Sequence, residues 1–539
     1  MASTSASKGP LPLPIAVQAP VLEASAIVSE IAAKDTRPWY QKSNLRSLYL
    51  LMIPGLLGVE YTSGFDSSMM NGIQTITFWE EYFDNPKEAR LGILSASYSL
   101  GSICALPLVP WVNEKYGRKF AIYLGSVIMI IGAVLQGASQ HFAMFVISRV
   151  ILGYGIPFAI VAASSLIGEL AHPRERPIMT SLFNCSWFVG AIIAAGVTLG
   201  TFDMKSNWSW RIPSYLQFVP SVTQIAALYW IPESPRYLVM KDRHDEARAI
   251  LVKYHAEGDE TSELVNGEMA QIKATIEVEI ENKKMGWREF FTSAANRKRA
   301  VLALCVGVFA QWSGNGPLSF YLKKILDQVG ITDRREQNIL NVGITCWQLV
   351  NGAAAAMAVR RVKRRTMYLT CVCGMLAVYI MLTTSSARYA MTGTKGAGVA
   401  TIVAIFCYSP FYNMGFNALT YTYLVEIFPY TIRAKGITMQ QLFGRLATFI
   451  NVFVNPIGLD TIGWRYYLWY CVWITVEIIV IYCIFPETSK HTLEELAFLF
   501  EGQEMQDRVD AKVLKGMEAN ALAEGVEHRE MVQSPEQTV

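Results

Sequence analysis

The sequence carries little charge for its length. Asp, Glu, Lys and Arg make up 17% of its 539 residues, whereas about 25% is usual for soluble proteins. Hydrophobic residues account for 52%, and the mean hydropathy is +0.27. The formal net charge of +3 is too small to indicate nucleic-acid binding. This composition predicts a protein that is embedded in a lipid bilayer.

Features of several other protein classes are missing. The nine cysteines lie mostly inside apolar runs, without the spacing of metal ligands or of a disulfide framework. The N-terminus has no basic stretch followed by a short apolar run and a cleavage site, so the first membrane span is expected to direct insertion. No pairing of a nucleophile with a base recurs in the loops. The sequence therefore predicts no metal site, no cofactor, no catalytic residues and no enzymatic activity.

Twelve apolar runs are long enough to cross a bilayer, which takes roughly 20 residues in a helix. They lie near 48–71, 92–112, 120–139, 144–166, 178–200, 212–232, 300–321, 338–358, 367–386, 397–424, 437–458 and 466–485. The predicted organisation is a disordered tail (1–45), a six-helix bundle (46–232), a linker with short helices (233–299), a second six-helix bundle (300–500) and a disordered tail (501–539).

The two sets of six spans share landmarks. WR at 210–211 and PESPR at 232–236 recur as WR at 464–465 and PETSK at 486–490, about 254 residues later in both cases. Such a repeat indicates duplication of one half. The predicted fold class is therefore an all-α membrane protein with twelve transmembrane helices in two pseudo-symmetric six-helix bundles.

Basic residues near the span ends predict the orientation. They gather in loops that would share one face of the membrane, as in RRVKRR at 360–365, and the positive-inside bias makes this face the cytosolic one. Both termini would then lie in the cytosol. Asn207, in the tripeptide NWS, would lie outside and is a candidate glycosylation site.

Three charged residues inside the spans need an explanation, because an isolated ion there costs several kcal/mol, with estimates from about 2.5 upward. They are Glu60 and Asp66 in the first span and Arg149 in the fourth. Burial favours a neutral Asp66, and a nearby Arg149 favours the ionised form, so separating the two would couple Asp66 to a proton. The alternatives are a static pair that pins two helices, and a Glu60 that is solvated near the outer surface.

A carboxylate at a helix C-terminus and an arginine at a helix N-terminus both oppose the helix dipole, so each needs a specific partner. Glu169 and Arg176 have these positions in the first half, and Glu426 and Arg433 have them in the second. Because the arrangement occurs twice, we predict a cytosolic ring of ion pairs that holds the halves together when the inside is closed. Independent surface pairs, each worth about 0 to 1 kcal/mol, are the alternative.

Amides and aromatic residues are interleaved in the second six spans. Amides supply donors and acceptors for hydroxyl groups, and rings cover the apolar face of a sugar. Gly314, Gly316 and Pro317 interrupt the seventh span, and broken helices often line transporter sites. Hydrogen bonding between helices is the alternative for any single amide. The predicted substrate-binding residues are Gln311, Asn315, Tyr321, Gln348, Tyr421 and Asn451.

From about Tyr49 to Phe500 the sequence resembles the sugar porter family of the major facilitator superfamily. The motifs that carry the resemblance are GFD at 64–66, EKYGRK at 114–119, SR at 148–149, PESPR at 232–236, EIFP at 426–429 and PET at 486–488. Within the family, QWSGNG at 311–316 and YTYLVE at 421–426 are similar to the fungal lactose permease branch. The resemblance implies the major facilitator fold, a sugar carrier of the plasma membrane and a proton handled by Asp66 and Arg149. It also implies that the cytosolic gate includes Glu114, Arg118, Glu233 and Glu487.

The sequence departs from the pattern of hexose carriers. Ala191 stands where these usually have a fifth-span glutamine, and Ala310 and Gly316 replace amides in the seventh span. We therefore expect proton-coupled uptake of a disaccharide or other glycoside, rather than a simple hexose, by alternating access. The expected partners are a sugar or glycoside, a proton and the lipid bilayer. A carrier of a non-sugar metabolite is the main alternative, and a sugar sensor without transport is a minor one.

Overall fold

The computed structural model describes residues 37–86, 88–283, 294–358, 362–428 and 430–488, and all regular structure within them is helical. The first six spans are α2–η3–α3 (Ser43–Met52, Ile53–Leu57, Gly58–Ile73), α5–α6 (Glu88–Ala105, Val109–Tyr116), α7 (Arg118–Gly137), α8 (Phe142–Leu170), α9 (Arg176–Thr201) and α10–α11 (Trp208–Leu216, Phe218–Leu228). The second six are α16–α17 (Ala294–Trp312, Asn315–Phe320), α19 (Arg334–Ala358), α20 (Arg364–Thr392), α21–η4–α22 (Lys395–Tyr412, Asn413–Asn417, Ala418–Ile427), α23 (Tyr430–Ile462) and α24 (Tyr466–Ile484). The predicted tails lie largely (1–45) or wholly (501–539) outside the described residues.

Breaks within the spans shorten some helices, so that these helices do not qualify as membrane spans by length and hydropathy. By length and hydropathy alone, eight described helical runs qualify as spans, and a ninth does so if α5 and α6, bent by 50°, count as one. One qualifying run joins α23 to α24. The sixth span is divided into two short helices, and α16 begins with a basic turn that lowers its mean hydropathy. The helical order nevertheless gives the twelve predicted spans.

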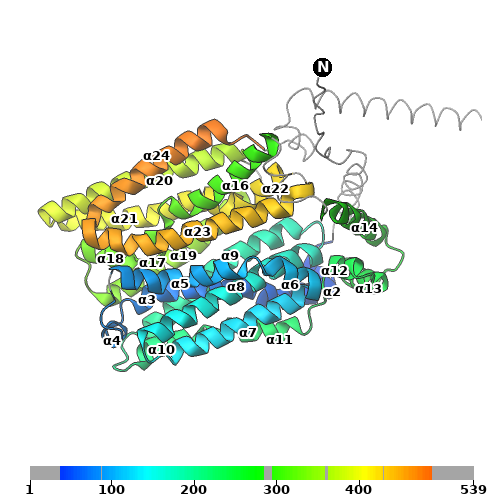
Figure 1. The fold of residues 1–539 in the computed structure, drawn as a ribbon, viewed down its shortest axis with the longest axis horizontal. Coiled ribbons are helices and arrows are strands. Elements are labelled where there is room, and N and C mark those ends of the chain that lie inside the picture. The colour runs from blue at the N-terminus through cyan, green and yellow to red at the C-terminus, as the bar shows by residue number, and fades with distance from the viewer. Residues whose placement is uncertain (1–36, 87, 284–293, 359–361, 429, 489–539) are drawn as a thin grey trace, which may run out of the picture.

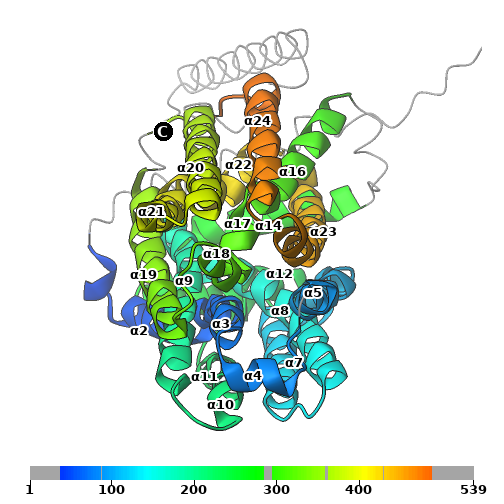
Figure 2. The same ribbon diagram turned by 90° about the vertical axis from the view of Figure 1, so that its left-hand side faces the viewer.

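The two bundles repeat the same packing. In the first bundle α3 packs on α9 and α7 on α8, and in the second α16 packs on α23 and α20 on α21. Each second-bundle pair lies six spans after its counterpart, which is the signature of a pseudo-two-fold axis. The most extensive packing between the two bundles is that of α5 on α23 and of α9 on α19, and these two helix pairs are related in the same way. Figures 1 and 2 show the first bundle below the second, and the predicted major facilitator fold is confirmed.

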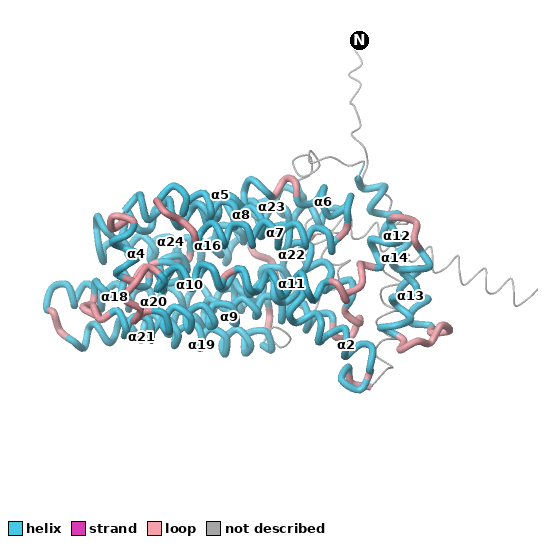
Figure 3. The backbone as a smooth tube through the Cα atoms, turned by 90° about the horizontal axis from the view of Figure 1, so that it is seen from below, coloured by secondary structure: helices cyan, strands magenta, loops and turns pink. Residues whose placement is uncertain are grey.

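Short helices distinguish the two ends of the molecule. The linker helices α12 (Pro235–Met240), α13 (His244–His255) and α14 (Glu263–Lys283) lie beside α2 at one end, which we call the linker face. The connecting helices α4 (Thr77–Tyr82) and α18 (Leu322–Gln328) lie at the other end, the opposite face (Figures 1 and 3). Odd-numbered spans therefore run from the linker face to the opposite face.

Small residues allow α5 and α8 to pack closely against each other. A Cβ atom on Gly153 would stand 1.9 Å from the carbonyl oxygen of Tyr98, and one on Gly101 would stand 2.1 Å from that of Val150. The Ser102 hydroxyl donates to the Gly153 carbonyl at 2.9 Å. Such close approach of small residues is a common way of packing membrane helices. It fixes the position, along the helix axes, of the α5 and α8 side chains that project into the interior.

Candidate functional site

Asp66 of α3 and Arg149 of α8 form a buried ion pair. Arg149 Nη1 and Nη2 donate to the two Asp66 carboxylate oxygens at 2.9 and 3.1 Å. The side chains are 3% and 1% exposed, respectively. Arg149 Nε donates to the Leu94 carbonyl at 2.7 Å, and Gln217 Nε2 donates to Asp66 Oδ1 at 3.0 Å. The predicted pairing is therefore present, and Gln217 from the sixth span completes it.

A cavity of about 320 Å³ lies between the bundles, and both members of this pair line it. This volume is at the lower end of the range for small-molecule sites, about 300 to 1,000 Å³. Three of the predicted substrate residues, Gln311, Asn315 and Gln348, also line it. The lining therefore combines amides from the second bundle with the charged pair of the first.

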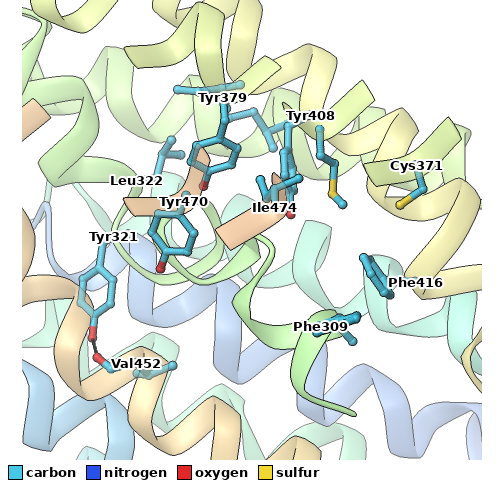
Figure 4. Packing of buried hydrophobic residues seen from close by; sticks show 14 of the residues in the cluster. Phe309, Tyr321, Leu322, Cys371, Tyr379, Tyr408, Phe416, Val452, Tyr470 and Ile474 are labelled. Atoms are coloured by element: carbon cyan, nitrogen blue, oxygen red, sulfur yellow. Dashed lines mark hydrogen bonds between the residues drawn. The ribbon is translucent and has the colours of Figure 1, made fainter. Parts of the chain in front are cut away.

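Two other predicted substrate residues lie outside the cavity lining. Tyr321 is fully buried, and its hydroxyl donates to the Val452 carbonyl at 2.6 Å (Figure 4). Asn451 donates to the Gln311 carbonyl at 2.6 Å and accepts from the Tyr470 hydroxyl at 2.9 Å. Both side chains form hydrogen bonds between helices of the second bundle. Hydrogen bonding between helices is the alternative given for the amides, and it holds for Asn451. The side chain of Tyr421, on α22, lies outside the described residues.

The seventh span is broken where the sequence predicts it. Gly314 has φ +99°, which separates α16 from α17 and which residues with a Cβ adopt at a cost. The Tyr379 hydroxyl donates to the Gly314 carbonyl at 2.6 Å, and a Cβ at this position would meet the Tyr379 ring at 2.2 Å. The break places Asn315 at the start of α17, facing the cavity.

The linker face carries the same ion-pair arrangement twice, once in each bundle. Arg118 Nη2 lies 3.1 Å from Glu169, and Arg364 Nη2 lies 3.1 Å from Glu426. These contacts join helices of one bundle. They differ from the predicted ring, in which such pairs hold the two halves together, because each arginine starts a helix beside the carboxylate of its own half.

Two further predicted gate residues, Glu233 and Glu487, support the same arrangement. Glu233 accepts from the Lys119 amide at 3.3 Å, and Glu487 accepts from the Arg364 amide at 2.9 Å, so each caps the start of a helix. Burial raises the pKa of Glu233, although its hydrogen bonds oppose this. Glu114 lies in α6, and the side chain of Arg433 lies outside the described residues.

Arg176 does not pair with Glu169. Its Nη2 lies 3.8 Å from Glu268 of the linker helix α14, so it joins the first bundle to the linker. Glu268 also accepts from His255 Nδ1, with 2.6 Å between the two atoms. The Glu257 carboxylate holds the start of α2 by accepting from the Asn44 and Leu45 amides at 3.1 and 3.0 Å. The linker is thus tied to the first bundle.

The bundles contact each other directly at the opposite face. Glu80 of α4 lies 2.9 Å from Arg334 and also contacts Lys323, both of the second bundle. Arg334 donates to the Thr75 carbonyl at 2.9 Å, and Asn71 Nδ2 donates to the Ser319 carbonyl at 2.5 Å. These contacts join the two bundles at the opposite face.

Residues 52–500 match the family described as "Sugar (and other) transporter". The chain belongs to the sugar porter family of the major facilitator superfamily. This is a family of carriers and not of enzymes, so the expectation of no enzymatic activity is confirmed. The multi-pass membrane topology agrees with this membership.

Curated relatives cover most of the chain. A high-affinity glucose transporter of Kluyveromyces lactis is 28% identical over 458 residues, covering 80% of this chain and 81% of the relative. The hexose transporter HXT13 of Saccharomyces cerevisiae is 25% identical, covering 84% and 83%.

A solved structure of the Escherichia coli xylose transporter XylE, described as partially occluded and inward open, has a TM-score of 0.69 and 20% identity. It covers 84% of this chain and 100% of its own. Similarity at this identity supports the fold alone.

Several residues that line the cavity were not predicted from the sequence. Ala191 is buried, whereas Asn184, two turns earlier on α9, lines the cavity, so the fifth span does contribute an amide. Arg445 of α23 lies inside a predicted span, and the cost of a charge there could have identified it. Glu60 lines the cavity, in contrast to the alternative of a solvated residue near the outer surface. In the described part of the chain, no cluster of three or more His, Cys, Asp or Glu could hold a metal.

Proposed function

We propose that the protein takes up a sugar, with a disaccharide or other glycoside preferred to a simple hexose, together with a proton. The observation that carries this proposal is the buried Asp66–Arg149 pair, which lines a cavity shared by both bundles. In this proposal the linker face lies in the cytosol, the membrane is the plasma membrane, and Asn207, at the start of α10 on the opposite face, is a glycan acceptor outside.

The coupling step depends on the charge of Asp66. Protonation of its carboxyl would remove the charge that binds two of the Arg149 nitrogens, while Arg149 would keep its hydrogen bond to the Leu94 carbonyl. Loss of this pair would free α3 and α8 to shift relative to each other. The substrate hydroxyls would bind the Gln311, Asn315 and Gln348 amides of the facing bundle, so proton and sugar act on opposite walls of one cavity.

Similar proteins support transport of a sugar and its coupling to a proton. The K. lactis relative is described as a glucose transporter, and a structure with a TM-score of 0.69 is described as a proton:xylose symporter bound to 6-bromo-6-deoxy-D-glucose. A proton that moves inward down about 100 mV releases roughly 2.3 kcal/mol. This free energy supports about fiftyfold accumulation of substrate.

Uptake of labelled sugars in a cell without its own sugar carriers tests the proposal. Wild-type protein should accumulate at least one sugar above its outside concentration, and a protonophore should abolish the accumulation. Asp66→Asn should lose accumulation but retain exchange of sugar across the membrane. Asp203→Asn is the matched control, because Asp203 is exposed in the α9–α10 connection. Unchanged accumulation by Asp66→Asn would reject the coupling role.

Export or uptake of a non-sugar metabolite is the second candidate. The observation that favours it is the presence of two further charged side chains, Glu60 and Arg445, in the cavity. If the wild-type protein is folded and transports none of the tested sugars or glycosides, this candidate replaces the first.

A further inference from the structure

Glu60 and Arg445 face the cavity from opposite bundles. Glu60 is on α3 and Arg445 is on α23, and each lies near the middle of its span. The two are not joined in an ion pair of 4.0 Å or less, and among the described residues neither side chain has a hydrogen-bond partner. This contrasts with Asp66 and Arg149, which satisfy each other.

Leaving two charges unpaired at mid-membrane depth is costly, and charged residues in spans usually mark a substrate path. A carboxylate only accepts hydrogen bonds and a guanidinium only donates them. A hydroxyl group can do both, so a group of sugar hydroxyls can satisfy Glu60 and Arg445 at once. An anionic ligand would gain from Arg445 but would be repelled by Glu60, which makes it the poorer match.

The position of the two residues separates them from two of the predicted substrate-binding amides, Gln311 and Asn315. Glu60 lies six residues before Asp66, about 9 Å nearer the linker face along α3. Gln311 and Asn315, at the end of α16 and the start of α17, lie toward the opposite face. One sugar ring at these amides would leave Glu60 and Arg445 to a second ring.

We propose that Glu60 and Arg445 form a charged subsite that binds the hydroxyls of the second sugar unit of a neutral disaccharide or glycoside. The inference rests on the proposed sugar transport and names the substrate class. Because its two members belong to different bundles, a bound second ring would draw the bundles together at the linker end of the cavity. A monosaccharide would not reach both residues while it contacts Asn315.

Counterflow in proteoliposomes with the purified full-length protein tests the subsite. The probes are labelled lactose and cellobiose as disaccharides, glucose and xylose as monosaccharides, and glucuronate as an anion. Glu60→Gln and Arg445→Gln should each lower kcat/KM for the disaccharides about tenfold to hundredfold, as expected for lost hydrogen bonds to charged groups. They should change monosaccharide transport less than about threefold. Glu81→Gln and Arg388→Gln, which replace exposed residues on α4 and α20, are the matched controls.

The outcomes separate this inference from the proposed function. Equal losses for monosaccharides and disaccharides overturn the subsite but leave sugar transport in place. If the protein transports glucuronate and only Arg445→Gln abolishes this transport, the proposed subsite is overturned in favour of a site for carboxylates. Failure of the wild-type protein with every sugar overturns both proposals.

If the variants do not fold, ligand-induced thermal stabilisation of the wild-type protein decides. Disaccharides should bind at least about tenfold more tightly than monosaccharides, because only they reach the charged subsite. Equal or weaker binding of disaccharides rejects the proposal.

Discussion

Replacing Glu80 with Gln should loosen the opposite face. Glu80 of the first bundle pairs with Arg334 and Lys323 of the second. The three side chains are 20%, 33% and 16% exposed, respectively, so each pair is worth at most about 1 kcal/mol. The variant keeps the shape of the side chain but removes its charge from both pairs. We therefore expect the closed state to lose about 1 to 2 kcal/mol relative to the open state.

Hydrogen exchange of the purified protein measures this change. Exchange through local opening reports the free energy of that opening. Amides of Thr77–Tyr82 and Leu322–Gln328 should exchange about fivefold to thirtyfold faster in the variant. The bonds from Arg334 to the Thr75 carbonyl and the Thr77 hydroxyl, at 2.9 and 2.8 Å, remain, so full opening is not expected.

Glu81→Gln makes the same chemical change one residue away. The side chain of Glu81 is exposed and has no hydrogen-bond or ion-pair partner among the described residues. If both variants exchange at the same rate, the contacts of Glu80 do not hold the two bundles together at this face, and the expected role of these ion pairs is refuted.

Two further predictions concern helix packing and the linker. Gly153→Ala should destabilise the protein by about 1 to 3 kcal/mol, because its Cβ would overlap the Tyr98 carbonyl. Gly168→Ala should not, because a Cβ there would have no atom within 4 Å. Thermal unfolding in detergent measures both effects. Burial by itself lowers the pKa of His255, but the charge and hydrogen bond of Glu268 raise it overall above the usual 6.5. Its stabilising effect should therefore be complete below pH 6.5 and lost as the pH rises through the raised pKa, so hydrogen-exchange protection of α14 should fall in that range. His255→Asn should remove this dependence, and an unchanged pH profile would contradict the assignment.

Some site residues could be predicted from the sequence because one physical rule singles them out. A charge inside an apolar span must be paired or functional, and this rule identified Asp66 and Arg149 without any spatial information. The same rule, applied to α23, would also have selected Arg445. Glycine next to a potential ligand-binding amide correctly indicated the break at Gly314.

Partner choice could not be predicted in the same way. Glu169 and Arg176 are close in sequence, yet Glu169 pairs with Arg118 and Arg176 with Glu268. Tyr321 and Asn451 have the chemistry of sugar-binding residues, but neighbouring helices occupy their hydrogen-bonding groups. Which side of a helix faces the cavity depends on how that helix is rotated against its neighbours.

The sequence by itself determined that the protein is embedded in a lipid bilayer, how many spans it has and that one half is duplicated. The length of the apolar runs, the hydropathy and the repeated landmarks are properties of the chain alone. The tertiary structure decided which polar groups are still available to a substrate. Asp66 and Arg149 satisfy each other, whereas Glu60 and Arg445 do not, and this difference depends on distances between helices that are far apart in the sequence. Hydrogen bonding acts over about 3 Å, so only the packed arrangement of both bundles can settle it.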